Sequence, residues 1–407
     1  MSVTHAPPVA TAARPHLLTL VIAAAVSALA MTMFVPAVPS IARDFATDPA
    51  LVQLGLSIYL VTTAIVQLAV GPMADLKGRR PVLLYAMMLF VLGTAICVLA
   101  PNVTWFLIGR VLQGASSAGL VLSRTIIRDL YGRERAASMI GYVVMAMAVA
   151  PMVGPWIGGV IDETFGWRGI FVLLGAVGIV STLAIWFDLA ETNATLGRPL
   201  REQVAAYRSL GSNSAYWVFT ATGAFASGVF FAFLGAAPQI ADTVLGMSPS
   251  RYGAWFAFCA GGYALGNFLS GRFAERMGLG RMILLGAIFT LAGALSIGTA
   301  FALGFEHPFS LFGFVSLVGI GNGMVLPSNV AAAISIRPDA AGAASGLLGT
   351  LQTATGAFAA YVSAALVGDG SRVLWFAAWI IASASLGVLF ALLSARVLKR
   401  GSELGTP

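Results

Sequence analysis

One arginine lies inside an otherwise uncharged apolar block of the sequence. The block covers residues 81–123, and Arg110 is its single charged residue. A charge within a membrane span is costly unless it faces a cavity or has a partner. Arg110 could therefore bind substrate or adjust the pKa of a proton-binding neighbour, and the alternative is an arginine that only clamps helices together. Because Arg110 is not near a helix end, we favour a functional role.

Other polar and aromatic residues lie in charge-free stretches and could line a substrate cavity. Each of them is equally well explained as packing between helices. The candidates for substrate binding beside Arg110 are Thr32, Phe34, Tyr59, Gln67, Phe231 and Asn322.

The sequence contains no constellation typical of an enzyme or a metal site. Intramembrane hydrolases need paired acids, a histidine-rich metal site or a Ser/His pair within their spans. The histidines His5, His16 and His307 fall at ends or in loops, and Cys97 and Cys259 fall in apolar stretches. We therefore predict no enzymatic activity, no metal, no cofactor and no disulfide. A sensor would need a soluble output domain, for which no segment is long enough.

The composition indicates a membrane protein. Apolar residues make up 58% of the 407 residues and charged residues only 10%, whereas soluble domains carry about 25% charged residues. A bilayer span needs about 20 apolar residues. Ten charge-free stretches are long enough or nearly so, and the block 81–123 is divided by Ala100-Pro101-Asn102 into two more. The sequence predicts an all-α membrane protein of twelve transmembrane helices. The ten stretches are 15–42, 49–74, 136–161, 169–187, 209–241, 252–271, 282–305, 308–336, 340–368 and 373–395.

The basic residues predict the orientation. If the N-terminus is cytoplasmic, the positive charges outside the spans fall on the cytoplasmic side except for four, Arg43, Arg168, Arg251 and Arg372. The positive-inside rule then places both termini of a multi-pass membrane protein in the cytoplasm. This bias explains the net charge of +7 without nucleic acid as a partner.

The chain is organised as a repeat. The segment 71–78 recurs as 271–278, each after the second helix of its half, and residues 188–214 form the longest polar stretch. We predict an N-terminal tail (1–14), a six-helix bundle (15–189), a cytoplasmic linker (190–214), a second six-helix bundle (215–396) and a C-terminal tail (397–407). Two such halves suggest a substrate site between them and alternating access by rocking.

Two motifs have features suited to conformational change. The first is the turn with Gly71, Asp75, Gly78, Arg79 and Arg80, whose acid could meet a helix N-terminus or the arginines. Glu275 is the matching acid of the second half. The alternative is a merely basic turn, which leaves the acid and the repeat unexplained.

The second motif is a Pro- and Gly-rich run in the fifth helix. It contains Gly154, Pro155, Gly158 and Gly159. Proline removes a backbone hydrogen bond, and glycines let a facing helix approach closely. The run suits a contact between halves that opens and closes, and the alternative is ordinary glycine packing.

These motifs resemble those of the major facilitator superfamily over nearly the whole chain. The turn 71–81 resembles its loop signature, Gly109-Arg110-Val111-Leu112-Gln113-Gly114 its intramembrane arginine motif, and 151–159 its antiporter motif. Residues 124–131, 230–235 and 338–348 are similar to the bicyclomycin and chloramphenicol resistance (Bcr/CflA) group. The resemblance implies a monomer of the cell inner membrane that exports small hydrophobic drug-like compounds in exchange for protons.

The chain departs from that pattern at one position. Relatives in the drug-antiporter group carry an acid in the first helix where this sequence has Thr32, which cannot titrate. Asp44, Asp129 or Asp242, near span ends, could bind the proton instead, or the Asp75 turn could couple protonation. The alternative is a facilitator or dedicated metabolite exporter without proton coupling. Arg110 without an embedded acid favours neutral or anionic substrates over lipophilic cations.

Overall fold

The structure is a computed structural model, and it describes residues 15–131, 133–193, 207–336, 341–368 and 372–403. All regular secondary structure in these ranges is helical. The first half contains α1 (Leu17–Thr32), η1 (Val35–Ala37), α2 (Val38–Asp44), α3 (Pro49–Lys77), α4 (Arg79–Leu99), α5 (Val103–Gln113), η2 (Gly114–Ser116), α6 (Ser117–Leu130), α7 (Arg133–Phe165) and α8 (Trp167–Asp188).

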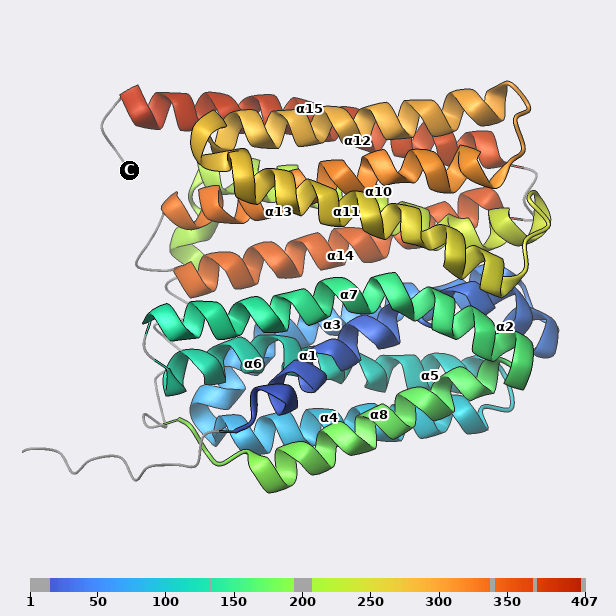
Figure 1. Cartoon of the computed structure of the whole chain (residues 1–407), viewed down its shortest axis with the longest axis horizontal. Coiled ribbons are helices and arrows are strands. Elements are labelled where there is room, and N and C mark those ends of the chain that lie inside the picture. The colour runs from blue at the N-terminus through green and yellow to red at the C-terminus, as the bar shows by residue number, and fades with distance from the viewer. Residues whose placement is uncertain (1–14, 132, 194–206, 337–340, 369–371, 404–407) are drawn as a thin grey trace, which may run out of the picture.

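The second half repeats the pattern with fewer interruptions. It contains α10 (Ser214–Thr243), α11 (Pro249–Met277), α12 (Leu279–Ala302), η3 (Phe309–Gly313), α13 (Phe314–Ile336), α14 (Ala341–Val367) and α15 (Val373–Glu403). In Figure 1 these helices run side by side, with the second half stacked on the first.

The helices have the length of membrane spans. In the described ranges nine helical segments are long and apolar enough to cross a bilayer. Three further helices, α7, α11 and α14, have 33, 29 and 27 residues and pack among the nine. The prediction of an all-α membrane protein is confirmed, and twelve spans, six in each half, remain a prediction for these three helices.

The bundle has two ends with different packing. We call the end where α8 finishes and α10 begins the linker end, and the opposite end, where α7 turns into α8 at Gly166, the distal end (Figure 1). At the distal end one buried apolar cluster takes residues from both halves, such as Phe34 and Phe106 with Leu234 and Tyr252. Toward the linker end the buried residues form two clusters, one within each half. The halves therefore share a core only toward the distal end.

Prolines explain where the first span is interrupted. Pro36 and Pro39 lack a backbone N–H, so they cannot donate to carbonyls four residues earlier. The α-helix stops at Thr32, passes through a 3-10 turn and resumes at Val38. Phe34 lies in this interruption, and its position there points the ring into the first half, where it is fully buried.

The repeated turns adopt the backbone that their glycines allow. Gly78 ends α3 with φ of 96°, and Gly278 ends α11 with φ of 80°. A positive φ of this kind is strained for other residues. The sequence repeat is thus a structural repeat, because the two glycines make equivalent turns at the linker end.

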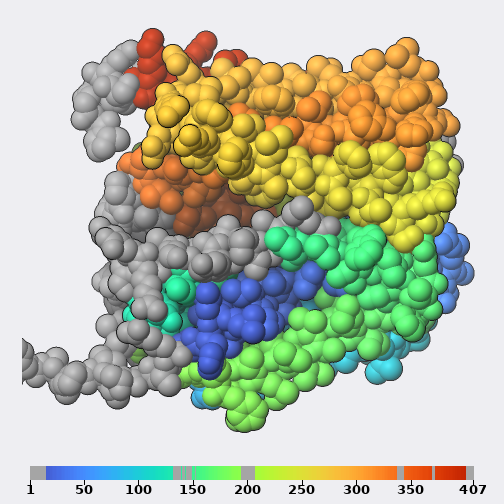
Figure 2. All heavy atoms as spheres, in the orientation of Figure 1, coloured from blue at the N-terminus to red at the C-terminus, as the bar shows by residue number. Residues whose placement is uncertain are grey.

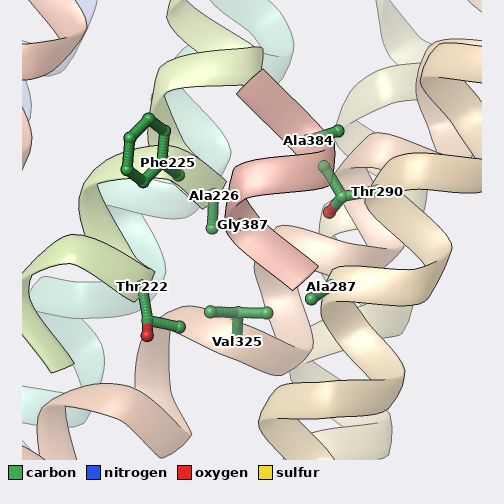
Figure 3. Close-up of a pocket in the computed structure, with 8 residues that line it drawn as sticks. All are labelled: Thr222, Phe225, Ala226, Ala287, Thr290, Val325, Ala384 and Gly387. Carbon is green, nitrogen blue, oxygen red and sulfur yellow. The ribbon is translucent and has the colours of Figure 1, made fainter. Parts of the chain in front are cut away.

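A narrow gap lies inside the second half. It is too tight for a water-sized sphere and is bounded by the residues in Figure 3, Thr222, Phe225, Ala226, Ala287, Thr290, Val325, Ala384 and Gly387. Their side chains are apolar apart from two hydroxyls. We interpret it as a packing gap between α10, α12, α13 and α15 and not as a substrate site.

Candidate substrate site and the contacts between the halves

Arg110 is completely buried inside the first half. Its Nε donates to the carbonyl of Gly55 at 3.2 Å, and its Nη1 donates to the carbonyl of Ala30 at 3.0 Å and to Gln113 Oε1 at 2.6 Å. The side chain therefore joins α1 and α3 to its own helix. Neutral oxygen acceptors thus stabilise the guanidinium. Among the described residues no carboxylate forms an ion pair with it.

Two aromatic rings enclose the guanidinium. Its carbon lies 4.2 Å from the ring centroid of Phe34 and 4.6 Å from that of Tyr59. Such cation–π contacts stabilise a desolvated cation. The Nη2 atom remains buried without a hydrogen-bond partner among the described residues. A buried donor without an acceptor costs free energy. Nη2 could therefore donate a hydrogen bond to an acceptor on a ligand.

A second shell of hydrogen bonds orients these groups. Gln113 Nε2 donates to Thr94 Oγ1 at 2.8 Å, which fixes the amide whose oxygen accepts from Arg110. The Tyr59 hydroxyl donates to the carbonyl of Ser27 at 2.8 Å and lies 3.1 Å from Ser116 Oγ. Gln113 follows Arg110 by three residues in the segment 109–114, about one helical turn. Only this spacing in the sequence indicated that Gln113 could accept a hydrogen bond from Arg110.

The structure brings together some of the predicted site residues and separates others. Arg110, Phe34 and Tyr59 form one cluster in the first half. Thr32 is buried in the same helix as Ala30, and its hydroxyl donates to its own helix at the carbonyl of Ala28, 3.0 Å away.

The three other predicted residues lie elsewhere. Gln67 is half-buried on α3, with its Oε1 facing Gly349 of α14 at the seam between the halves. Phe231 packs on Gly356 within the second half. Asn322 is buried in α13, and its Oδ1 has no partner in the described part of the chain. These residues do not belong to the Arg110 cluster in this conformation.

The Pro- and Gly-rich run of α7 lies between two other helices. A Cβ atom at Gly154 or Gly158 would collide with Thr32 or Met33 of the first half. A Cβ atom at Gly159 would collide with the backbone of Pro249 in α11. One face of the helix therefore packs against its own half, and the adjacent face packs backbone to backbone against the other half.

Pro155 also lies at the contact between α7 and α11. Its carbonyl, and the backbone of Trp156, lie where a Cβ atom of Gly253 would be. At each of these two contacts between α7 and α11, one of the facing residues is a glycine, Gly159 or Gly253. Figure 2 shows the yellow atoms of α11 lying directly on the green atoms of α7.

The turn between α3 and α4 is capped from the start of the linker. Glu191 accepts from the backbone N–H groups of Arg79 at 3.0 Å and Arg80 at 3.2 Å, and it occupies the space where a Cβ atom of Gly78 would be. Asn193 Nδ2 donates to the carbonyls of Ala74 and Asp75, each at 3.2 Å. Glu191 therefore supplies a carboxylate at the N-terminus of α4.

The other charges of the turn also have partners. Asp75 lies near enough to attract the Arg79 guanidinium, which pairs with Asp129. Arg80 donates to the carbonyl of Trp186 at 2.8 Å. Glu275, the matching acid of the second half, is exposed, and a Cβ atom at Gly278 would meet nothing within 4 Å. The turns repeat in backbone but differ in what caps them.

The three proposed proton-binding acids all form ion pairs near helix ends. Asp44 pairs with Arg168 at 2.7 Å, Asp129 pairs with Arg79, and Asp242 pairs with Arg43 at 3.3 Å. Of the three, only Asp242 is paired across the two halves. None is in contact with Arg110.

Sequence reasoning missed one buried acid beside these pairs. Asp162, near the distal end of α7, is only 8% exposed and accepts from Ser40 Oγ at 2.6 Å. Arg43 Nη2 donates to the same Ser40 Oγ at 3.3 Å. Asp162 is thereby linked through Ser40 and Arg43 to Asp242 of the other half. Its position one residue beyond the charge-free stretch was the only signal.

Two more polar contacts join the halves at the distal end. The backbone N–H of Ser250 donates to Glu163 Oε1 at 3.0 Å. Gln53 Nε2 of α3 donates to the carbonyl of Leu234 of α10 at 3.1 Å, and both residues are buried. The signal for this second contact was Pro238, which removes the usual donor to Leu234.

Comparison with known proteins agrees with this architecture. The model of the Major Facilitator Superfamily matches residues 20–360 and 223–405. Multidrug resistance protein D of Escherichia coli (strain K12) is 30% identical over 87% of this chain and 90% of that protein. The chloramphenicol resistance protein of Pseudomonas aeruginosa is 32% identical over 77% and 73%. The bicyclomycin resistance protein homolog of Haemophilus influenzae is 28% identical over 88% and 91%.

A solved structure shares the fold. It is that of a bacterial homolog of the human lysosomal transporter Spinster in an inward-facing and unoccupied conformation. The TM-score is 0.72, and the match covers 93% of this chain and 96% of that one at 19% sequence identity. The family model and the relatives together show that this chain belongs to the major facilitator superfamily and is similar to its bicyclomycin and chloramphenicol resistance transporters.

Proposed function

We propose that this transporter exports small, hydrophobic, neutral or anionic drug-like compounds of the amphenicol or bicyclomycin type, by alternating access. The names of the resistance relatives support the class of compound. The observation that carries the preference for neutral or anionic compounds is the Arg110 cluster, where a buried cation lies between Phe34 and Tyr59 without a described carboxylate. A second cation would be repelled there, whereas a carbonyl, nitro or hydroxyl oxygen could accept from Nη2.

Opening at the linker end would give a compound access to this cluster. The buried cores of the two halves are separate at that end and continuous at the distal end. Movement of α1 or α3 relative to α5 would exchange the carbonyls of Ala30 and Gly55 for acceptors on the substrate. Phe34 and Tyr59 would then supply the apolar walls.

We propose exchange for protons as the driving reaction, with an acid at the distal end binding the proton. Asp162 and Asp242 lie on opposite sides of the seam and are linked through Arg43. Closing the seam removes Asp162 from water, and burial favours the neutral form of a carboxyl group. Proton binding would therefore favour closure of the distal end.

A facilitator or dedicated metabolite exporter is the second candidate. The observation that favours it is Thr32, a buried hydroxyl donating to Ala28 where drug antiporters carry an acid. Without a titrating group beside Arg110, substrate would cross only down its own gradient.

The proposed orientation places the linker end and both termini in the cytoplasm of an inner membrane. The charge distribution supports it, because Arg79, Arg80 and Arg128 are at the linker end and few basic residues are at the distal end.

Transport in liposomes tests the proposal. Purified protein is reconstituted, a pH gradient is imposed, and radiolabelled chloramphenicol and a lipophilic cationic dye are followed beside protein-free liposomes. We expect chloramphenicol to move against its own concentration gradient, driven by protons that move down theirs in the opposite direction. We expect the dye to move little. Downhill transport that ignores the gradient would favour the facilitator. Transport of the dye with no transport of chloramphenicol would contradict the proposed substrate class.

The acid is then identified with two matched variants. Asp162→Asn and Asp44→Asn each remove one distal carboxylate, but only Asp162 is linked to the other half. We expect the pH gradient to have no effect on chloramphenicol transport by Asp162→Asn. In Asp44→Asn the gradient should still drive transport. Retention in both would exclude Asp162 as the coupling group.

A further inference from the structure

A proline in one half creates a hydrogen-bond acceptor that the other half satisfies. Pro238 lies inside α10 and has no backbone N–H, so the carbonyl of Leu234, four residues earlier, lacks its helical donor. Gln53 of α3 donates its Nε2 to this carbonyl at 3.1 Å. Gln53 belongs to the first half and Leu234 to the second.

This bond lies in a buried part of the contact between the halves. Gln53 is 2% exposed and Leu234 is fully buried, within the apolar cluster that both halves share. An unpaired carbonyl away from water is costly. In the closed seam both residues are buried, so water cannot replace the donor there. The bond therefore contributes most when the distal end is closed, and it is lost when the halves separate there.

The neighbouring packing holds the acceptor in a fixed position. A Cβ atom at Gly235 would collide with the carbonyl of Ala360 in α14, so α10 lies backbone to backbone against its own half at this level. The exposed pair Arg43–Asp242 lies about two helical turns further along α10. The buried bond and the exposed ion pair thus connect the halves at two depths.

We propose that the hydrogen bond from Gln53 to the carbonyl freed by Pro238 is a latch that stabilises the distal-closed state, with Gln53 as a positioning residue for alternating access. The latch is independent of which compound is carried and of proton coupling. It predicts a specific dependence between two residues that are not in the same half, because the need for Gln53 exists only while Pro238 is a proline.

A double-mutant cycle on the full-length protein tests this dependence. Spin labels are placed at Thr164 and Thr243, exposed positions at the distal ends of α7 and α10, in a background where the buried Cys97 and Cys259 are alanine. The distance distribution between the labels gives the ratio of distal-open to distal-closed molecules. Gln53→Met removes the donor and keeps a side chain of similar length.

We expect Gln53→Met to raise that ratio about tenfold, the effect of leaving one buried acceptor unpaired. Pro238→Ala supplies an N–H for Leu234 within the helix. In that background Gln53→Met should change the ratio less than about twofold. Gln239→Met makes the same chemical change next to Pro238, on the other helix, and should leave the ratio within about twofold of the parent.

Three results would overturn the latch. The ratio could be unchanged by Gln53→Met in the parent protein, or it could shift equally in the Pro238→Ala background, which would mean that Gln53 acts by packing alone. Gln239→Met could also shift the ratio as strongly as Gln53→Met. If Gln53→Met does not fold, recovery of folded protein in the Pro238→Ala background supports the latch, and failure in both backgrounds contradicts it.

Discussion

Gly159 of α7 and Pro249 of α11 meet backbone to backbone across the seam between the halves, with no room for a side chain at Gly159. Since α7 lies in the first half and α11 in the second, this contact joins the two halves near the distal end. The close approach of α7 and α11 is possible only because Gly159 has no side chain. Gly253 creates the same condition on the opposite helix, against the carbonyl of Pro155.

A side chain at Gly159 should hold the distal end open. In Gly159→Val the new methyl groups would collide with the Pro249 backbone, which cannot move as a flexible side chain would. We expect the distal-open fraction to rise and the transport rate to fall by about tenfold or more. The spin-label distance between positions 164 and 243 measures the first effect, and reconstituted transport measures the second.

The matched control for this change is Gly261→Ala on α11. A Cβ atom there would meet nothing within 4 Å. Transport by this variant should stay within about twofold of the parent rate. An equal loss in both variants would show that helix glycines matter generally and that the seam contact has no special role.

The exposed ion pair at the distal end should contribute much less than the buried contacts. The side chains of Arg43 and Asp242 are 62% and 35% exposed, and exposed pairs contribute about 0–1 kcal/mol and weaken with salt. We expect Asp242→Asn to change the distal-open ratio less than about fivefold, and less again at high salt. A charge exchange, Arg43→Asp with Asp242→Arg, should restore the parent ratio. A large effect that salt does not reduce would contradict this assignment.

The cap supplied by the linker predicts a stability difference between the two repeats. Glu191 satisfies the backbone N–H groups at the start of α4, and such a cap contributes about 0.5–2 kcal/mol. Glu191→Ala should lower the melting temperature of the detergent-solubilised protein by about 2 °C or more. Glu275→Ala, the exposed acid of the second turn, is the control and should shift it less. Equal shifts would show that the linker does not stabilise the first turn.

The fold was predictable because charge-free stretches and repeated glycines report directly on membrane burial and backbone geometry. Gly78 and Gly278 have equivalent positive φ angles, as their repeat indicated. The partners of Arg110 were not predictable, since the carbonyls of Gly55 and Ala30 carry no side-chain signature. The expectation that Asp75 meets the arginines agrees with its attraction for Arg79. The cap from Glu191 was not predictable, because this residue lies more than a hundred positions further along the chain and only the fold brings it to the Gly78 turn.

Part of the site escaped prediction because polar atoms between halves have no sequence periodicity. Gln53 and Asp162 resemble ordinary polar residues near or within apolar helices, and only their neighbours in the other half distinguish them. Pro238 was the exception, since a proline inside a helix implies an unpaired carbonyl four residues earlier. That carbonyl is the one of Leu234.

Substitution of Arg110 separates recognition of substrate from stability of the bundle. Arg110→Lys keeps the positive charge but loses the planar fork that reaches Gly55, Ala30 and Gln113 at once. If Arg110 only clamps helices, the lysine variant should lose thermal stability, and its apparent KM for any substrate should be unchanged. Because Nη2 has no partner in the described structure, we expect the apparent KM for a neutral compound to rise about tenfold as well.

The charge preference of the site gives the sharper comparison. Arg110→Gln removes the cation between Phe34 and Tyr59, so a lipophilic cation should no longer be repelled there. We expect the ratio of dye transport to chloramphenicol transport to increase by about tenfold or more in this variant. Tyr59→Phe keeps the ring and the cation and loses only the hydroxyl that bonds Ser27, so it should leave this ratio unchanged. A ratio that is the same in parent and Arg110→Gln, with both rates reduced together, would show that Arg110 is a structural clamp and does not select substrate by charge.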